Sequence, residues 1–503
     1  MWSTISADSM AYCKKIMYIL LTMKKRRIVL VIVLVSLVFA SHIAAANGID
    51  EKLASNLFYY QSPMQNTTAS DEISINIRKL ELLYRLVNRD FLFEIDNDVV
   101  FESMAKALFT ALEDPYSGYV VAKEAADFSE ETTGTYGGIG AYISKHFLEY
   151  RDFSKPETYM VNITSVFPGS PAEMAGLRSG DLVSHIDGKP VDDMEAEDAS
   201  RALKGQPNTI VMLTIHRGST VFDVPVTRQI VSVPTVSKTY IDNDMIGYLR
   251  ITQFTNSTGQ QTREALQEFA GKPLKGVILD LRDNPGGIVD AALEVADMLL
   301  SGKQIVHIYG KNDTREKTYV AQRDTILKES IPLVLLVNKG SASSSEILAG
   351  ALKDNGRATL VGNTTFGKGL IQLVSPFDQG YYTLTTSQYR TPNNNDINKI
   401  GIPVDYEVDE ITVAEEKMDV YAKFIESGIA ETFVEEHPGY SEEHMDQFLE
   451  MVSGSETPLP TDVYRLVLRR LYLQEIPYDE RPLVDPDFDP VLKKAIELLE
   501  TNR

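Results

Sequence analysis

Cysteine and tryptophan are almost absent from this chain of 503 residues, which contains one of each, Cys13 and Trp2. A single cysteine cannot form an intramolecular disulfide, and its place near the N-terminus argues against a cysteine nucleophile or a cysteine-ligated metal. At roughly 150 residues per domain the chain has room for about three or four domains. A small scaffold held together by disulfides is therefore excluded.

Positive charge is also in deficit. Lys and Arg number 49 against 71 Asp and Glu, which gives a formal net charge of −22. A nucleic-acid binder needs a basic face to displace counterions from phosphates, so no nucleic-acid partner is expected. The hydrophobic fraction of 43%, with 24% charged residues, is typical of a globular protein and not of a disordered or fibrous one.

The apolar run closest to the N-terminus has the pattern of an export signal. Basic residues at 24–27 directly precede the apolar stretch 28–40, and small residues follow it, in the order of a secretory signal. If the segment is not cleaved, residues 28–46 are long enough to span a bilayer. We therefore expect an exported protein of the periplasm or cell envelope, with the inner-membrane anchor left open as the alternative to cleavage. The membrane would be contacted only through this segment.

Two amphipathic helices are predicted after a polar linker. Apolar residues step by three and four from Ile73 to Phe91, and again from Val100 to Leu112, so each run forms one helical stripe. The second stripe ends before Asp114 and Pro115. We expect these helices to form a cap without chemistry of its own.

From about residue 134 to 232 the chain changes to short β-type runs separated by Gly, Pro and Asp. The segments GGIG, SPAEMAGLRSGD and LVSHIDGKPV resemble those of a bacterial PDZ domain. Successive glycines let backbone N–H groups converge on a carboxylate, and the strand that follows offers an open edge to an extended peptide. The resemblance implies a site for protein tails with an apolar C-terminal residue. The residues expected to bind the tail are Gly137, Gly138, Ile139 and Gly140.

An α/β pattern follows, from residue 233 to 410. The apolar run Gly276 to Leu281 predicts a buried strand, which leads through a glycine-bearing turn into a helix from Ala291. Leu333 to Val337 predicts a second strand, followed by a serine-rich turn and a helix through Lys353. Strand, turn and helix in repetition predict a layered α/β core with a site at the strand ends.

Motifs for nucleotide or metal chemistry are incomplete. Residues 362–368 match the first seven positions of a phosphate-binding loop, but Gly369 replaces the Ser or Thr that would bind magnesium. The acidic run 485–490 resembles a calcium loop, but Pro490 stands where glycine is required. None of the seven histidines lies in a glycine- or serine-rich turn, and no HExxH motif occurs. No metal and no cofactor are expected.

A serine with a lysine base is the hydrolytic chemistry that remains. Ser343 lies in the turn between a buried strand and a helix, whose N-terminus favours developing negative charge. Lys368 can act as a base only if desolvation lowers its pKa. Phe366 and the apolar strands that flank Lys368 are expected to provide that environment.

The segments LDLRDNPGG, NKGSASSSEILAGALKDNGRA and VGNTTFGKGLIQ resemble those of the carboxyl-terminal processing (tail-specific) serine proteases, exported enzymes with a PDZ domain and a Ser-Lys dyad. The resemblance implies that Ser343 is the nucleophile, Lys368 the general base and Gln372 the supporting glutamine. Positions four apart on a strand point the same way, so Gln372 is expected to share a face with Lys368. The implied oxyanion donors are the backbone N–H groups of Gly287 and Ser344, where the family usually has alanine. Three adjacent serines leave the nucleophile open from sequence alone.

The sequence thus predicts an α/β multidomain protein with a ClpP/crotonase-like protease core and an inserted PDZ domain. It would act as an exported serine endopeptidase on proteins with apolar C-terminal tails; self-association and an adaptor partner are left open. The alternative is a non-catalytic PDZ adaptor that presents such tails to a partner. The predicted parts are a signal or anchor (1–46, its start before Met23 in question), a linker (47–70), a helical cap (71–133), the PDZ domain (134–232), the catalytic core (233–410) and a C-terminal helical extension (411–503).

Overall fold

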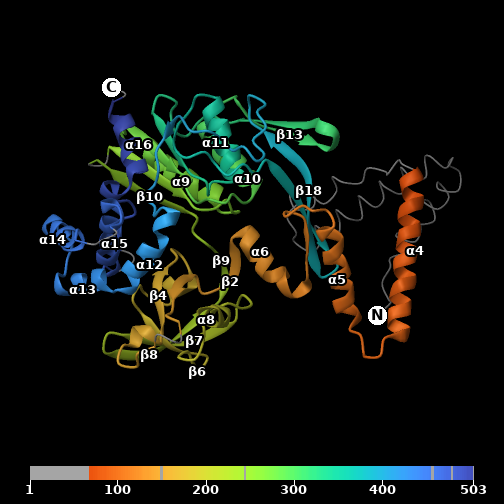
Figure 1. Cartoon of the computed structure of the whole chain (residues 1–503), viewed down its shortest axis with the longest axis horizontal. Coiled ribbons are helices and arrows are strands. Elements are labelled where there is room, and N and C mark those ends of the chain that lie inside the picture. Colours follow the sequence, from red (N-terminus) through yellow and green to blue (C-terminus); the bar gives the residue numbers. More distant parts are fainter. Residues whose placement is uncertain (1–66, 148–150, 243–244, 455–457, 477–479, 502–503) are drawn as a thin grey trace, which may run out of the picture. The chain divides into compact units, whose positions relative to one another are not determined.

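The computed structural model describes residues 67–147, 151–242, 245–454, 458–476 and 480–501 (Figure 1). The predictions for the export segment at 1–46 and for most of the linker fall outside these residues. The linker prediction is wrong for residues 67–70, which belong to helix α4 (Thr67–Asp90). Among the described residues, no helix combines the length and the apolar character that crossing a membrane requires.

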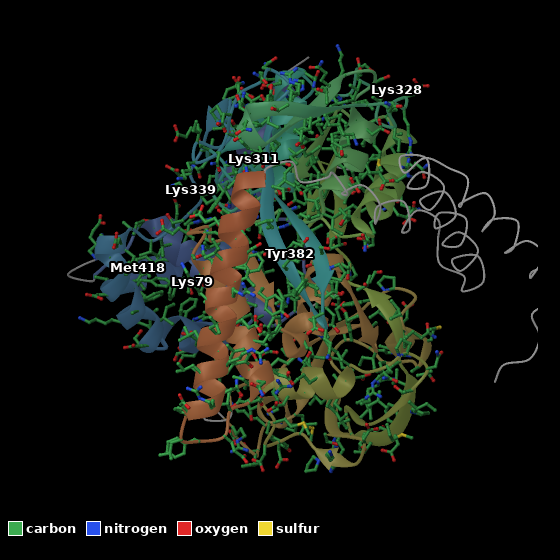
Figure 2. The ribbon with its side chains drawn as sticks, turned by 90° about the vertical axis from the view of Figure 1, so that its right-hand side faces the viewer. Lys79, Lys311, Lys328, Lys339, Tyr382 and Met418 are labelled. Carbon is green, nitrogen blue, oxygen red and sulfur yellow. The ribbon has the colours of Figure 1, made fainter. Side chains whose placement is uncertain are left out.

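The chain divides into two compact units, Met1–Asp96 and Asn97–Arg503. The first contains α4, so the helix predicted from the stripe between Ile73 and Phe91 is confirmed. Figure 2 labels Lys79 on this helix. All other elements belong to the second unit.

A six-stranded sheet forms the centre of the second unit. Its strand order is β10-β11-β12-β15-β16-β19. Neighbours from β11 to β19 pair in parallel, and β10 pairs antiparallel at one edge. Strands of a parallel sheet are buried on both faces, so their sequences are continuous apolar runs. Strands β12 and β15 were predicted from this pattern. The bounds are β10 (Val236–Ile241), β11 (Ile246–Ile251), β12 (Gly276–Asp280), β15 (Leu333–Val337), β16 (Thr359–Gly362) and β19 (Tyr406–Glu407).

Helices cover both faces of this sheet. Leu279 and Leu335 share a core with helices α9, α10 and α11, whereas Ile278 and Leu336, one position away, share a core with helix α16. Alternate side chains of each strand therefore face opposite helical layers, which confirms a layered α/β core. Helix α16 is part of this core, although the sequence placed it in a separate extension. The bounds are α9 (Thr258–Ala270), α10 (Val289–Leu299), α11 (Ser344–Asp354) and α16 (Pro490–Thr501).

The loop that follows α5 (Asn97–Thr110) is hydrogen-bonded to a second sheet. The strand order of this sheet is β1-β18-β13-β14, and β17 also pairs with β18; Figure 1 labels β13 and β18. Tyr382 of β18, labelled in Figure 2, lies opposite Tyr119 of β1. The pairing of β17 with β18 is irregular between Ile371 and Gln372. The bounds are β1 (Gly118–Val120), β13 (Gln304–Gly310), β14 (Thr314–Val320), β17 (Leu370–Phe377) and β18 (Gly380–Arg390).

The predicted PDZ region folds around its own core. Its sheet has the order β3-β4-β5-β7-β8, with β6 paired to β5. Side chains of this sheet and of helices α7 and α8 form the core. Strands β2 and β9 pair antiparallel, which brings the start and the end of the region together. The bounds are β2 (Thr135–Gly138), β3 (Ala141–Ser144), β4 (Val161–Val166), α7 (Pro171–Met174), β5 (Leu182–Ile186), β6 (Lys189–Pro190), α8 (Ala196–Leu203), β7 (Ile210–Arg217), β8 (Thr220–Thr227) and β9 (Gln229–Ser232).

Four helices after residue 417 pack around a further apolar core. Helix α15 begins at Thr461, directly after Pro460. Helix α16 begins at Pro490, and Asp489 Oδ1 accepts a hydrogen bond from the Leu492 N–H at 2.9 Å. The bounds are α12 (Met418–Glu426), α13 (Ile429–Glu436), α14 (Glu442–Val452) and α15 (Thr461–Gln474).

Candidate active site

The candidate site lies where the parallel strands β12, β15 and β16 end. The carboxyl ends of parallel strands meet at one edge of a sheet, so the three loops that follow them come together. These loops carry Gly287, Ser343 and Lys368 respectively. The candidate catalytic residues thus come from three separate stretches of sequence and gather at one sheet edge.

Ser343 stands at the N-terminus of α11 in an uncommon backbone conformation. Its φ is 55° and its ψ is −114°. A positive φ is costly for a residue other than glycine and persists only where surrounding contacts enforce it. A backbone hydrogen bond holds this turn against the loop after β12: the Ala342 N–H donates to the Asn284 carbonyl at 3.0 Å.

The four serines of this turn differ in what their hydroxyls contact. Ser341 donates to the Leu281 carbonyl at 2.8 Å, Ser344 to the Gly287 carbonyl at 2.8 Å, and Ser345 to the Asn284 carbonyl at 2.9 Å. These three serines are fully buried, whereas Ser343 is partly exposed. Of the four, Ser343 is the one that a substrate could reach.

Gly286 and Gly287 bring a second backbone segment against the nucleophile turn. Both have positive φ, 100° and 132°. A Cβ on Gly286 would lie 2.7 Å from the Ser343 Cβ and 2.9 Å from the Ser344 nitrogen, so only glycine fits. Among the described residues, the N–H groups of Gly287 and Ser344 donate to no backbone carbonyl. Two backbone donors are therefore available beside Ser343, as an oxyanion site requires.

Glu346 joins the nucleophile turn to the Lys368 loop. Its buried carboxylate accepts hydrogen bonds from the backbone N–H groups of Ser343 (2.9 Å), Gly367 (2.7 Å) and Lys368 (2.8 Å), and from the Thr365 hydroxyl (2.6 Å). Glu346 was not among the site residues expected from the sequence. A glutamate three positions after a serine at a helix start has the spacing of a capping box, which was the available signal.

Tyr389 of β18 joins the same two loops from another side. Its hydroxyl lies 2.9 Å from the Ser343 carbonyl oxygen and 2.5 Å from the Lys368 carbonyl oxygen. Burial, and then the charge of Glu346, raise the pKa of Tyr389 well above its usual value, so the phenol stays protonated as a donor. Tyr389 was also not predicted, because the sequence of a strand does not indicate which distant residues a tyrosine hydroxyl will contact.

Lys368 lies in the loop before β17 and is partly buried. Burial lowers the pKa of its amine, while the charges of Asp114 and Glu346 act in the opposite direction. Phe366, expected to desolvate the lysine, is 57% exposed. An aromatic ring that was not predicted contacts the amine: the Lys368 Nζ is 4.5 Å from the centroid of Tyr116. No hydrogen bond joins Lys368 Nζ to Ser343 Oγ in the described part of the chain.

The expected alignment of Gln372 with Lys368 is wrong in its geometry. Lys368 precedes the first strand residue, Leu370, and the strand is irregular before Gln372, so strand alternation does not relate the two. The Gln372 amide donates to the Thr385 hydroxyl at 3.0 Å.

The predicted tail site has an open strand edge but little free space. Strand β3 is the outer strand of its sheet, while Gly137 and Gly138 pair with β9. A cavity of 30 Å³ lies beside β3, and Tyr136 is among its lining residues. Burial raises the pKa of Tyr136 to about 12. The Lys204 ammonium is 5.0 Å from the centroid of this ring and 2.5 Å from Glu130.

Comparison with known proteins identifies the family of the chain. The model of peptidase family S41 matches residues 245–408, and that of the PDZ domain matches residues 163–217. A "Probable CtpA-like serine protease" of Staphylococcus aureus (strain COL) is 32% identical over 338 residues, which is 66% of this chain and 65% of that protein. The chain thus spans just under two thirds of this relative's length.

A "Carboxy-terminal-processing protease" of Bartonella bacilliformis is 34% identical over 335 residues, covering 65% of this chain and 74% of that protein. Among solved structures, a photosystem II D1 C-terminal processing protease is 31% identical, with a TM-score of 0.39, over 66% of this chain and 86% of that one. The extent of the match to the Bartonella protein is enough to assign the family. The chain belongs to the carboxy-terminal-processing proteases of peptidase family S41.

Proposed function

We propose that this protein is an exported serine endopeptidase that docks the C-terminal tail of a protein substrate in its PDZ domain. In this proposal Ser343 is the nucleophile and Lys368 the general base. The N–H groups of Gly287 and Ser344 stabilise the oxyanion. Family membership supports a peptidase over the PDZ adaptor, which no observation favours.

The observation that carries the proposal is the difference between Ser343 and its neighbours. Three serines of the turn are buried and donate to backbone carbonyls, while Ser343 is partly exposed beside two N–H groups without a backbone acceptor. Glu346 and Tyr389 tie the same turn to the loop of Lys368. Nucleophile, base and oxyanion donors are the parts that acyl transfer needs.

The reaction has two halves. Lys368, as the neutral amine, takes the proton of the Ser343 hydroxyl while the Ser343 oxygen forms a bond to the scissile carbonyl carbon. The N–H groups of Gly287 and Ser344 donate hydrogen bonds to the resulting oxyanion. The C–N bond then breaks and Lys368 returns the proton to the leaving amine. Water, deprotonated by Lys368, attacks the acyl-enzyme in the second half. The C–O bond to Ser343 breaks and the serine recovers its proton.

The tail-binding part of the proposal rests on the free edge of β3. An extended peptide would add to this edge as a further strand, with its carboxylate toward the glycine segment at 137–140. Because the cavity beside β3 is small, a small apolar side chain fits it better than a large one. Export rests on the sequence of residues 1–46 alone.

Cleavage of a protein with an apolar C-terminal tail tests the proposal. Ser343→Ala and Lys368→Ala should each reduce kcat/KM by at least about a thousandfold while leaving binding of a tail peptide unchanged. Lys339→Ala, an exposed lysine of the same turn, is the matched control and should keep full activity. Full activity in either of the first two variants would refute the dyad.

A further inference from the structure

The loop between α5 and β1 is held rigidly on β18, next to Lys368. Asp114 Oδ1 accepts the Tyr116 N–H at 3.1 Å, and Asp114 Oδ2 accepts the Ser117 hydroxyl at 2.6 Å. The Ser117 hydroxyl in turn accepts the Thr385 N–H at 2.9 Å. The Tyr116 carbonyl accepts the Thr383 hydroxyl at 3.1 Å. From the sequence, these residues were expected only to end a helix in a cap without chemistry.

Two groups of this loop, the Tyr116 ring and the Asp114 carboxylate, stabilise the Lys368 ammonium. The Lys368 Nζ lies 4.5 Å from the centroid of the Tyr116 ring, within cation–π distance. The carboxylate of Asp114 stabilises the charged form of Lys368, and Lys368 likewise favours ionised Asp114. Burial alone would raise the pKa of Asp114, but its hydrogen bonds and the charge of Lys368 bring it below its usual value. Asp114 is thus an anion at neutral pH.

The other charged group that acts on Lys368 is Glu346. Its carboxylate already accepts four hydrogen bonds, three of them from backbone N–H groups, so it serves mainly to hold the two loops. Asp114 and Tyr116 have a different relation to the lysine: the Tyr116 ring centroid lies 4.5 Å from its amine, and Asp114 acts on the amine through its charge. Gln372 joins the same arrangement through Thr385, whose hydroxyl it contacts.

We propose that Asp114 and Tyr116 are positioning residues for Lys368: they hold its side chain and stabilise the ammonium that forms when it takes the proton of Ser343. This inference rests on the proposed dyad. A base gains a positive charge during proton transfer, and a fixed anion and an aromatic face lower the free energy of that charge. The same interactions reduce the fraction of neutral lysine at low pH. The loop therefore decreases the fraction of neutral Lys368 and at the same time makes the neutral amine a stronger base.

These two opposing effects give a distinctive pH profile. In Asp114→Asn, which keeps the shape and Oδ1 acceptor, the acid limb of kcat/KM should move down by about one pH unit. At pH values below the acid limb, kcat/KM should rise about threefold, because a larger fraction of Lys368 is neutral. On the alkaline plateau kcat/KM should fall by about the same factor, because the neutral amine is a weaker base. Tyr116→Leu should move the limb in the same direction. Tyr116→Phe keeps the ring and Glu113→Gln removes a neighbouring exposed charge, so both should keep the wild-type limb.

A measurement without activity separates the inference from the dyad. In full-length protein carrying Ser343→Ala, trace acetylation by acetic anhydride across pH 7–11, followed by mass spectrometry, titrates the Lys368 amine. Adding Asp114→Asn should lower that titration midpoint, and adding Glu113→Gln should not. An unchanged midpoint together with an unchanged kcat/KM profile would overturn the inference. If Ser343→Ala keeps wild-type peptidase activity, the proposed function itself fails.

Discussion

The Glu346 carboxylate accepts a hydrogen bond from the backbone N–H of Lys368 at 2.8 Å, across 22 positions of sequence. The same carboxylate accepts the Ser343 N–H at 2.9 Å. One buried anion therefore fixes the distance between the two loops that carry the proposed nucleophile and base. Hydrogen bonds to a buried carboxylate are stronger than those between neutral groups.

Glu346→Gln should damage both stability and activity. The amide keeps one oxygen acceptor but turns an NH₂ group toward N–H donors, so at least one buried donor loses its partner, at a cost of about 1–3 kcal/mol. We expect a lower melting temperature and a fall in kcat/KM of about tenfold or more. Thermal unfolding and hydrolysis assays measure the two effects. Glu415→Gln, an exposed glutamate outside the site, should change neither, and a fully active Glu346→Gln enzyme would contradict the role given to Glu346.

Tyr389→Phe removes one oxygen that bridges the Ser343 and Lys368 carbonyls. Because the ring stays, the core packing should survive and the loss should be about 1–2 kcal/mol. If the hydroxyl aligns the loops for reaction and not for binding, kcat should fall about tenfold with KM unchanged. A rise in KM alone would show that Tyr389 serves substrate binding instead.

The site could be predicted where its residues belong to recognisable segments. Ser343, Lys368 and Gly287, which the structure brings to one sheet edge, were each proposed from a turn or motif in the sequence. Glu346, Tyr389, Asp114 and Tyr116 were not, because their roles depend on contacts between loops that are far apart in the chain. The relation between Lys368 and Gln372 was misjudged because strand alternation was applied across a loop residue and an irregular pairing, neither of which the sequence reveals.

The pH dependence follows from the lowered pKa of Lys368. In the proposed dyad the active form of Lys368 is the neutral amine, so kcat/KM should rise with pH through that pKa and then level off. Between the lowered value and the ordinary 10.5 the unfolded chain binds the extra proton, so folding stability also rises with pH in this window. Lys368→Met should flatten that part of the stability curve, as melting temperatures across pH 7–11 would show. An equally steep curve in the variant would assign the effect to other groups.

Helix α16 should behave as part of the catalytic core. Leu492 is fully buried in the cluster that α16 forms with strands of the central sheet. Leu492→Ala should cost roughly 2–5 kcal/mol, because it leaves a cavity in that layer. Denaturant unfolding followed together with peptidase activity measures this. Leu483→Ala, at a 40% exposed position, is the control. Loss of α16 without loss of core stability would contradict the assignment.

A buried ion pair joins the start of this helix to the central sheet. Arg282, two residues after the end of β12, contacts Asp280 and Asp489, each at 2.7 Å. Burial lowers the pKa of Arg282, but these two carboxylates outweigh it and raise the pKa overall. The sequence shows an arginine after a strand and an aspartate before a helix, 207 positions apart, and gives no sign that they pair. The strands themselves were predictable because burial on both faces leaves continuous apolar runs.

Reaction of the full-length protein with a fluorophosphonate tests the central claim most directly, because the reagent bonds only to an activated serine. Peptide mass spectrometry should find the adduct on Ser343 in the wild type and in Ser344→Ala, and no adduct in Ser343→Ala or Lys368→Ala. An adduct on Ser341, Ser344 or Ser345 in the wild type, or undiminished labelling in Lys368→Ala, would contradict a Ser343–Lys368 dyad.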